Sequence, residues 1–207
     1  QTILIFQIFI SGCLSLDQIA SPSLNPREIM IVFTGNLLSE LKPCGCAKEE
    51  DQGGIERRMQ YIKETRRIYP HLLLLDTGDQ FKEPTRQGKL KAETLLIATE
   101  KMQYEAIALG DRDMVYGSKF LKDRPKIPWI AGNLIIDQFK LTRSKVKSFS
   151  NGLKVGILAV ADPALFHDYI GLKVTDPKVT TLSLITKMRE TEKPDLIVLL
   201  THAKQQE

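Results

Sequence analysis

The chain has 207 residues, of which 43% are hydrophobic and 26% charged, so it has the composition of a globular protein of about one domain. This composition excludes wholesale disorder, a collagen-like repeat and a membrane protein with several spans. The net charge of +4 is spread along the chain and is only weak evidence for nucleic-acid binding, which usually needs a clustered basic face. Three cysteines are too few for a disulfide framework.

The first 13 residues have the pattern of an export signal. Residues 3–10 (ILIFQIFI) are almost wholly apolar, are too short to span a bilayer, and are followed by Ser11-Gly12-Cys13. An apolar residue, two small residues and a cysteine resemble the lipobox of bacterial lipoproteins, and this resemblance implies that Cys13 is acylated. An ordinary first β-strand or a buried helix is the alternative interpretation of the same residues.

Residues 14–27 are rich in Ser, Pro and Asn, as expected of a tether between a membrane and a folded domain. By the same resemblance, Leu14 and Ser15 after the cysteine favour the outer membrane. We therefore expect an exported, lipid-anchored protein on the periplasmic side of that membrane or in the cell envelope. The folded domain then covers residues 28–207. Because the chain begins at Gln1 and ends just after an apolar run, we also expect it to be cut from a longer gene product.

From residue 28 onward, apolar runs typical of buried strands alternate with amphipathic helices. We expect strands at residues 29–33, 72–75, 106–109, 129–132, 155–160 and 196–200, and helices at residues 55–69, 89–103 and 177–190. Continuous apolar strands separated by helices indicate sheets that are covered on both faces. The pattern predicts an α/β fold with layered helices.

Polar residues follow four of the predicted strands. In open α/β sheets, ligands bind outside the carboxyl ends of the strands, so these positions are candidates for a site. Carboxylates and an imidazole gathered there are typical of a site for a divalent metal ion. Each aspartate taken singly is more readily explained as a helix cap or a turn residue. The residues concerned are Asn36, Asp76 with Asp79, Asp111 with Asp113, and Thr201 with His202.

The order of motifs along residues 29–202 resembles the N-terminal domain of the 5'-nucleotidase branch of calcineurin-like metallophosphoesterases. The segments that carry the resemblance are residues 34–39 (TGNLLS), 52–57 (QGGIER), 75–81 (LDTGDQF), 104–113 (YEAIALGDRD), 128–134 (PWIAGNL) and 199–202 (LLTH). The resemblance implies a layered β-sandwich flanked by helices, in the order α-β-β-α, which would be incomplete at its C-terminal end. The family's closing Gly-His-x-His motif would lie beyond residue 207.

The resemblance also implies a site for two divalent ions, of Mn, Zn, Fe or Mg, which bind a phosphoester and activate water. Asp79 stands at the family's bridging aspartate and His202 at one of its late histidine ligands. Asp111 stands at an asparagine ligand, and Asn36 at the first aspartate ligand, where it supplies an amide oxygen without a charge. The residues expected to support this site are Asp76, Asp113 and Asn133.

Two departures from the family's motifs put the ordinary chemistry in doubt. Leu38 stands where the family has its first histidine ligand, and a leucine cannot coordinate a metal. Arg112 stands where the family has a histidine that assists the leaving group. Its guanidinium can clamp phosphate, but it cannot transfer a proton near neutral pH. We expect one of the two metal positions to be weakened or absent.

A close pair of cysteines, Cys44 and Cys46, lies in the segment Pro-Cys-Gly-Cys just after the altered first motif. Two residues this close do not readily form a disulfide with each other, but they can present two thiolates to one soft metal ion. A metal or redox role and a purely structural, partly buried pair are both open.

Two functional hypotheses follow. The first is an exported, lipid-anchored, metal-dependent phosphoesterase that resembles 5'-nucleotidases and acts on a small phosphoester or nucleotide rather than on a nucleic-acid polymer. The second is a non-hydrolytic lipoprotein of the same fold that binds a metal or takes part in redox chemistry through Cys44 and Cys46.

Overall fold

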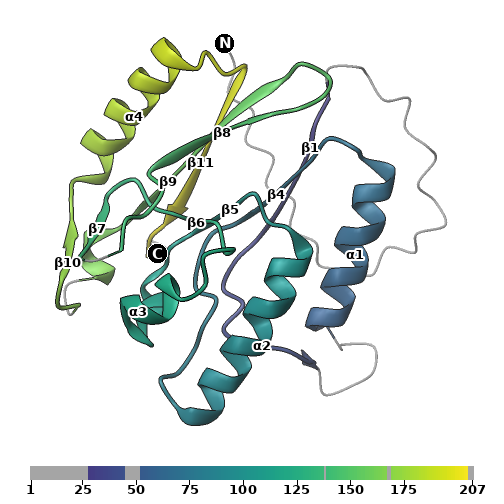
Figure 1. Ribbon diagram of the computed structural model, residues 1–207, viewed down its shortest axis with the longest axis vertical. Coiled ribbons are helices and arrows are strands. Elements are labelled where there is room, and N and C mark those ends of the chain that lie inside the picture. The colour runs from purple at the N-terminus through teal and green to yellow at the C-terminus, as the bar shows by residue number, and fades with distance from the viewer. Residues whose placement is uncertain (1–27, 45–51, 138, 167–168, 205–207) are drawn as a thin grey trace.

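The computed structural model describes residues 28–44, 52–137, 139–166 and 169–204 (Figure 1). The lipobox-like segment with Cys13, the predicted tether and Cys46 lie outside the described residues. No helix in the described part of the chain is long and apolar enough to cross a membrane.

Four parallel strands form the first sheet, in the order β1-β4-β5-β6. They are β1 (Met30–Thr34), β4 (Leu72–Asp76), β5 (Ala106–Ala108) and β6 (Trp129–Ile130). Successive side chains of a strand point to opposite faces. In β4, Leu74 packs with the residues of the helices, whereas Leu73 and Leu75 pack with residues of the second sheet.

Three helices, α1 (Ile55–Ile68), α2 (Arg86–Met102) and the short α3 (Gly117–Lys122), share one core cluster with this sheet. α2 begins three residues earlier than the sequence pattern predicts, because the Thr85 side chain accepts a hydrogen bond from Gly88 N and caps the first turn. Gln103 adopts a left-handed conformation and ends the helix.

The second sheet has three strands in the order β11-β9-β8, namely β11 (Leu196–His202), β9 (Lys154–Ala161) and β8 (Ser144–Ser148). β11 runs parallel to β9, and β8 runs antiparallel to it. Val155, Ile157 and Ala159 pack against the first sheet, whereas Leu158 packs against α4 (Pro177–Thr191) on the outside.

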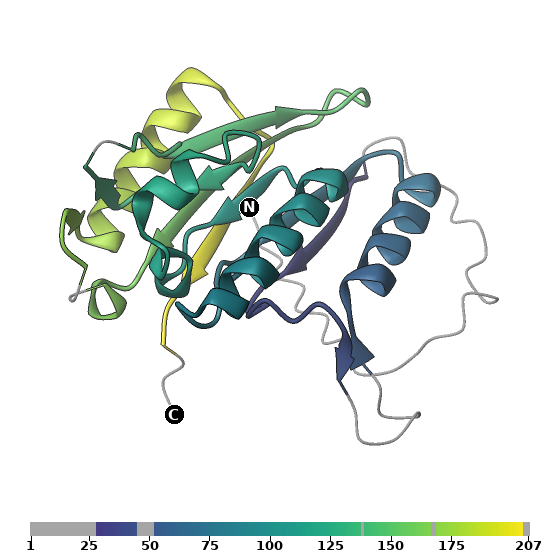
Figure 2. The ribbon, with the colours of Figure 1, turned by 60° about the horizontal axis from the view of Figure 1, so that its bottom comes forward.

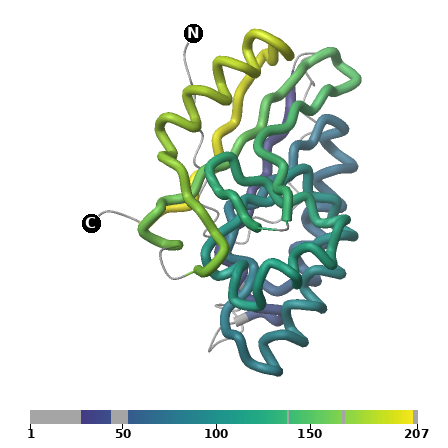
Figure 3. Tube along the Cα trace, turned by 60° about the vertical axis from the view of Figure 1, so that its left-hand side comes forward, coloured from purple at the N-terminus to yellow at the C-terminus, as the bar shows by residue number. Residues whose placement is uncertain are grey.

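The layers therefore follow the order helices, sheet, sheet, helix. Figure 2 shows α1 and α2 on one outer side and α4 on the other, and Figure 3 shows the same separation from another direction. The predicted α/β class with layered helices is confirmed. The sequence pattern does not define several short elements. Among them are two antiparallel strand pairs, β2 (Pro43–Cys44) with β3 (Gln52–Gly53) and β7 (Leu134–Ile136) with β10 (Leu172–Val174), and the 3-10 turns η2 (Asp111–Met114) and η3 (Pro163–Leu165).

Candidate metal centre

Three predicted ligands come together where strands of the two sheets end. Asp79 follows β4, Asp111 opens η2 after β5, and His202 is the last residue of β11. One ligand atom of each lies within 4.8 Å of those of the other two. The ends of three separate strands thus place two carboxylates and one imidazole around a common point.

The hydrogen bonds of His202 define which ring nitrogen is free to bind a cation. Its Nδ1 lies 3.0 Å from the carbonyl oxygen of Thr77, and because a carbonyl can only accept, Nδ1 must carry a proton. The Nε2 atom lies 3.1 Å from Asp111 Oδ1 and 3.4 Å from Asp79 Oδ1. The Nε2–Asp111 contact is a hydrogen bond in which the carboxylate accepts, so a bound cation would replace the Nε2 proton and take up the lone pair between the two carboxylates. This donor set suits a divalent cation, and the bond to Thr77 is the kind of outer contact that orients a metal-binding histidine.

Asp79 is buried at the centre of this group and is held in a left-handed backbone conformation, with φ of 61°. Its Oδ1 accepts a hydrogen bond of 3.1 Å from Arg112 N. Burial raises the pKa of Asp79, and the neighbouring charge of Asp111 raises it further, whereas His202 and Arg112 oppose the rise. The cost of the buried charge is one that a bound cation would offset.

Two glycines allow the ligand-bearing loops to approach each other backbone to backbone. A Cβ on Gly78, whose φ is 98°, would lie 2.8 Å from Gly110 N. A Cβ on Gly110 would collide with the Asp79 carboxylate. Only glycine at both positions leaves room for this contact. The sequence signal was present in the two Gly-Asp pairs, but their close approach was not predictable from their positions in the chain.

The residues expected to support the site lie around the three ligands rather than among them. Asp113 is completely buried below the two loops. Asp76 is also buried, and it accepts hydrogen bonds from the Thr34 hydroxyl and from Gly78 N. Burial raises the pKa of Asp76 to about 6, although both hydrogen bonds oppose the rise.

Asn133 braces the strand beside His202. Its amide nitrogen donates to Ala161 O and Thr175 O, and its amide oxygen accepts from Ala161 N. Ala161 is the register partner of His202 in the β9–β11 pair. Asn133 therefore fixes the end of β9 next to the histidine.

The loop after β1 approaches the same place without bringing a charged ligand. Asn36, Leu38 and Ser39 all have left-handed φ values, of 51°, 48° and 57°. Their backbone N–H groups donate to the carbonyl oxygens of Gly78, Asp79 and Gln80, so this loop lies against the loop that carries Asp79. Asn36 on this loop is exposed and carries no charge.

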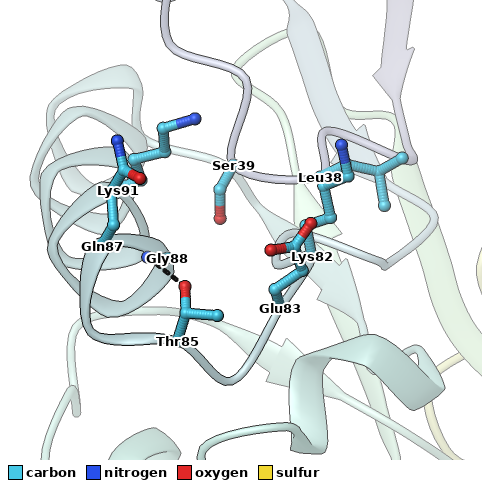
Figure 4. Close-up of a pocket in the computed structure, with 8 residues that line it drawn as sticks. All are labelled: Leu38, Ser39, Lys82, Glu83, Thr85, Gln87, Gly88 and Lys91. Atoms are coloured by element: carbon cyan, nitrogen blue, oxygen red, sulfur yellow. Dashed lines mark hydrogen bonds between the residues drawn. The ribbon is translucent and has the colours of Figure 1, made fainter.

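Leu38 and Ser39 form one wall of a small pocket of about 70 Å³ between this loop and the start of α2 (Figure 4). Lys82 and Lys91 lie on opposite sides of the pocket, and Thr85 lies at the start of the helix. At residue 38, the structure therefore has an apolar side chain beside a small pocket that Lys82, Lys91 and Glu83 also line.

Arg112 extends from η2 next to Asp79, with its Nε 3.8 Å from Asp79 Oδ2 and about half of its side chain exposed. Tyr169, which the sequence patterns did not single out, donates its hydroxyl hydrogen to the carbonyl oxygen of Asp111.

Of the predicted cysteine pair, Cys44 lies in β2 opposite Gln52. The cysteine pair stays a prediction, because Cys46 is not among the described residues.

No protein-family model matches the chain. Curated relatives include the snake venom 5'-nucleotidase of Naja atra, with 27% identity over 116 residues, and that of Crotalus adamanteus, with 32% identity over 101 residues. These matches cover 52% and 46% of this chain but only 22% and 17% of the relatives. The 5'-nucleotidase of Bos taurus is 28% identical over 116 residues, which are 53% of this chain and 20% of that protein. The chain thus matches about a fifth of the length of these relatives.

Solved structures show the same fold at lower sequence identity. The 5'-nucleotidase precursor from Thermus thermophilus has a TM-score of 0.74 and 19% identity, covering 84% of this chain and 37% of that one. The calcineurin-like phosphoesterase YfkN from Bacillus subtilis has a TM-score of 0.68 and 20% identity, covering 86% of this chain and 63% of that one. The chain is therefore homologous to the 5'-nucleotidases over about half of its length, and it has the fold of the calcineurin-like phosphoesterases.

Proposed function

We propose that this chain is the metal-binding domain of an exported, lipid-anchored phosphoesterase that acts on small phosphoesters such as nucleotides. The observation that carries the proposal is the cluster of Asp79, Asp111 and His202, whose ligand atoms lie within 4.8 Å of one another. Homology to 5'-nucleotidases supports the same class of substrate.

The donor set supports one position for a divalent ion, of Mn, Zn, Fe or Mg. Asp79 and Asp111 would supply negative charge, and the Nε2 of His202 would supply a nitrogen ligand. Asn36, on the neighbouring loop, would add an uncharged amide oxygen. A divalent ion bound by these residues would supply Lewis-acid chemistry: it would bind a phosphoryl oxygen and lower the pKa of a water molecule.

Arg112 is the residue that we propose to hold the phosphoryl group. Its side chain is half exposed and starts beside Asp79, so the guanidinium can reach a ligand at the cluster while its backbone N–H stays bonded to Asp79 Oδ1. A guanidinium matches phosphate geometry with two parallel hydrogen bonds. Because it stays protonated at neutral pH, it stabilises charge and does not act as the general acid.

Two features support export of the protein to the cell envelope. Similarity to snake venom 5'-nucleotidases supports an exported protein, and the lipobox-like segment that ends at Cys13 supports a lipid anchor. Labelling the full-length protein in cells with a fatty-acid analogue tests this directly. We expect label in the wild type and none in Cys13→Ser, and equal labelling of both proteins would contradict the anchor.

Hydrolysis tests the activity. The purified full chain is assayed with Mn²⁺, Zn²⁺, Fe²⁺ or Mg²⁺ against nucleoside monophosphates and p-nitrophenyl phosphate. We expect metal-dependent release of phosphate that is lost in His202→Ala and kept in His71→Ala, whose histidine lies at the opposite end of β4. Absence of hydrolysis with every metal, or equal hydrolysis by His202→Ala, would refute the proposal.

A second candidate is a non-hydrolytic protein that binds a metal or a redox partner through Cys44 and Cys46. Leu38 and Arg112 favour it, because one stands at the position of a ligand without being able to coordinate and the other cannot transfer a proton. Replacing both cysteines with serine tests it by metal analysis and thermal unfolding. Unchanged metal content and stability would count against this candidate.

A further inference from the structure

The carboxylate of Asp113 joins the two loops that carry the proposed metal ligands. Asp113 lies in η2, and its side chain is completely buried. Its Oδ2 accepts hydrogen bonds from Asp79 N at 3.0 Å and Gly110 N at 2.9 Å, and its Oδ1 accepts one from Gln80 N at 2.7 Å. One side chain thus satisfies three backbone donors from two loops.

These three donors need an acceptor because of how closely the loops approach. The contact between Gly78 and Gly110 has no room for a Cβ, and the N–H groups beside it are buried with it. A buried N–H group without a partner costs about 1–3 kcal/mol. Both side-chain oxygens of Asp113 accept hydrogen bonds here, whereas the amide of an asparagine would turn its own N–H₂ toward one or more of these donors.

The same hydrogen bonds set the positions of two proposed ligands. Asp79 is held in its left-handed conformation with its N–H bonded to Asp113, and its side chain is thereby directed toward His202. Asp111 directly follows Gly110, whose N–H is bonded to the same carboxylate oxygen. Asp113 itself is not one of the three clustered residues.

We infer that Asp113 is a positioning residue that fixes the separation of the Asp79 and Asp111 ligand atoms from below, without binding the ion. The inference rests on the proposed function, because it concerns the same metal site. A purely structural role would also make Asp113 important for stability, since it caps the η2 turn through Gly110 N. The two roles differ in what happens to metal coordination in a variant that is still folded.

The test uses the full chain carrying Asp113→Asn, which keeps the size of the side chain. Leu184→Ala is the control for lost stability, because Leu184 packs in the cluster between α4 and β9, on the outer side of the second sheet. Each protein is titrated with Mn²⁺ to obtain a dissociation constant, and is loaded with Co²⁺ to record the visible ligand-field spectrum. The spectrum reports the arrangement of ligands and not the free energy of unfolding.

We expect Asp113→Asn to weaken Mn²⁺ binding by about 10- to 100-fold, as outer-shell substitutions do, and to change the Co²⁺ spectrum. Leu184→Ala should bind both ions as the wild type does. If Asp113→Asn does not fold, Asp113→Glu takes its place, because it keeps the carboxylate and displaces it by one methylene group. The same changes are expected.

Wild-type affinity and a wild-type spectrum in a folded Asp113 variant would overturn the inference while leaving the proposed metal site intact. Failure of the wild type itself to bind Mn²⁺ and Co²⁺ would refute the proposed metal site, and the inference with it. The wild-type titration therefore separates the two failures.

Discussion

The loops that follow the strands form a rim with two sides. The backbones of the two sides are joined by hydrogen bonds, but their side chains differ in chemistry. On the side formed by β4, β5 and β11, the loops bring Asp79, Asp111 and His202 within coordinating distance of a common point. On the β1 side, the loop is bonded to the carbonyl oxygens of Gly78, Asp79 and Gln80, but it presents an exposed Asn36 and an apolar Leu38.

This difference shows that the backbone conformation of a loop does not determine whether its side chains can bind a metal ion. The β1 loop has left-handed φ values at three non-glycine residues, Asn36, Leu38 and Ser39, which is costly for leucine in particular. Its hydrogen bonds to the β4 loop are made by backbone atoms and so do not depend on the chemistry of the side chain at residue 38. A fold match therefore reports the backbone of a site, and its chemistry has to be read from the side chains.

The largest effect is expected from Asp79→Asn, which removes the negative charge of the central ligand on the side formed by β4, β5 and β11. Substituting a residue that only orients a metal ligand already lowers metal affinity by about 10- to 100-fold. We therefore expect this substitution to lower the affinity for Mn²⁺ by at least about 100-fold. Stability without metal should be unchanged or higher, because burial raises the pKa of Asp79 and its charge is costly in the absence of a cation. Calorimetric Mn²⁺ titration measures the affinity. Asp123→Asn, which changes an exposed aspartate paired with Lys119, is the matched control, and equal affinity in both variants would contradict the assignment.

A second effect concerns stability and pH at Asp76, which lies between the two sides and is bonded to Thr34 of β1. Its pKa is about 6 in the folded state against 3.8 ordinarily, so the folded protein binds more protons than the unfolded chain between these values. The free energy of unfolding should therefore fall by about 3 kcal/mol as the pH rises from about 4 to about 6. Asp76→Asn should lack this part of the pH dependence.

Urea unfolding of both proteins at several pH values, in the presence of a chelator, measures the difference. Parallel curves for the wild type and Asp76→Asn would show that Asp76 titrates normally.

A smaller effect is expected from Arg112→Ala. Hydrogen bonds to charged groups contribute about 1.5–3 kcal/mol, so inorganic phosphate should bind the Mn²⁺-loaded variant at least about tenfold more weakly. Mn²⁺ affinity should not fall, because the backbone N–H of residue 112 still bonds to Asp79 and the lost guanidinium, 3.8 Å from Asp79 Oδ2, would repel a cation. Arg189→Ala on α4 is the control with the same change of charge. Equal phosphate affinity in both variants would remove Arg112 from the proposed mechanism.

The smallest effect is expected from restoring ligands on the β1 side. Asn36→Asp with Leu38→His adds a carboxylate and an imidazole, and histidine tolerates the left-handed conformation of residue 38 better than leucine does. We expect a second, weaker equivalent of bound Mn²⁺. The matched control is Asn36→Asp with Leu37→His, which adds the same groups one residue away. A second equivalent in both variants, or in neither, would contradict the view that only side-chain identity distinguishes the two sides.

Much of this architecture was predictable, because long apolar strands and amphipathic helices have strong periodic patterns. The ends of β4 and β11 identified Asp79 and His202 as neighbours before any distance was known. The short pairs β2–β3 and β7–β10 were not predictable, since strands of two or three residues are too short to show a periodic pattern and β7 pairs with a strand far along the chain. The hydrogen bond from Asp79 N to Asp113 and the one from His202 Nδ1 to Thr77 O could not be predicted from the sequence either. Both form only where loops that are distant in the chain meet.

The central claim is that only the β4–β5–β11 side of the rim holds a divalent ion tightly. Titration of the full wild-type chain with Mn²⁺, followed by electron paramagnetic resonance, counts the ions bound at high affinity. The account predicts one equivalent per chain, which is lost in His202→Ala. Two equivalents of similar affinity, or one that persists in His202→Ala, would contradict it.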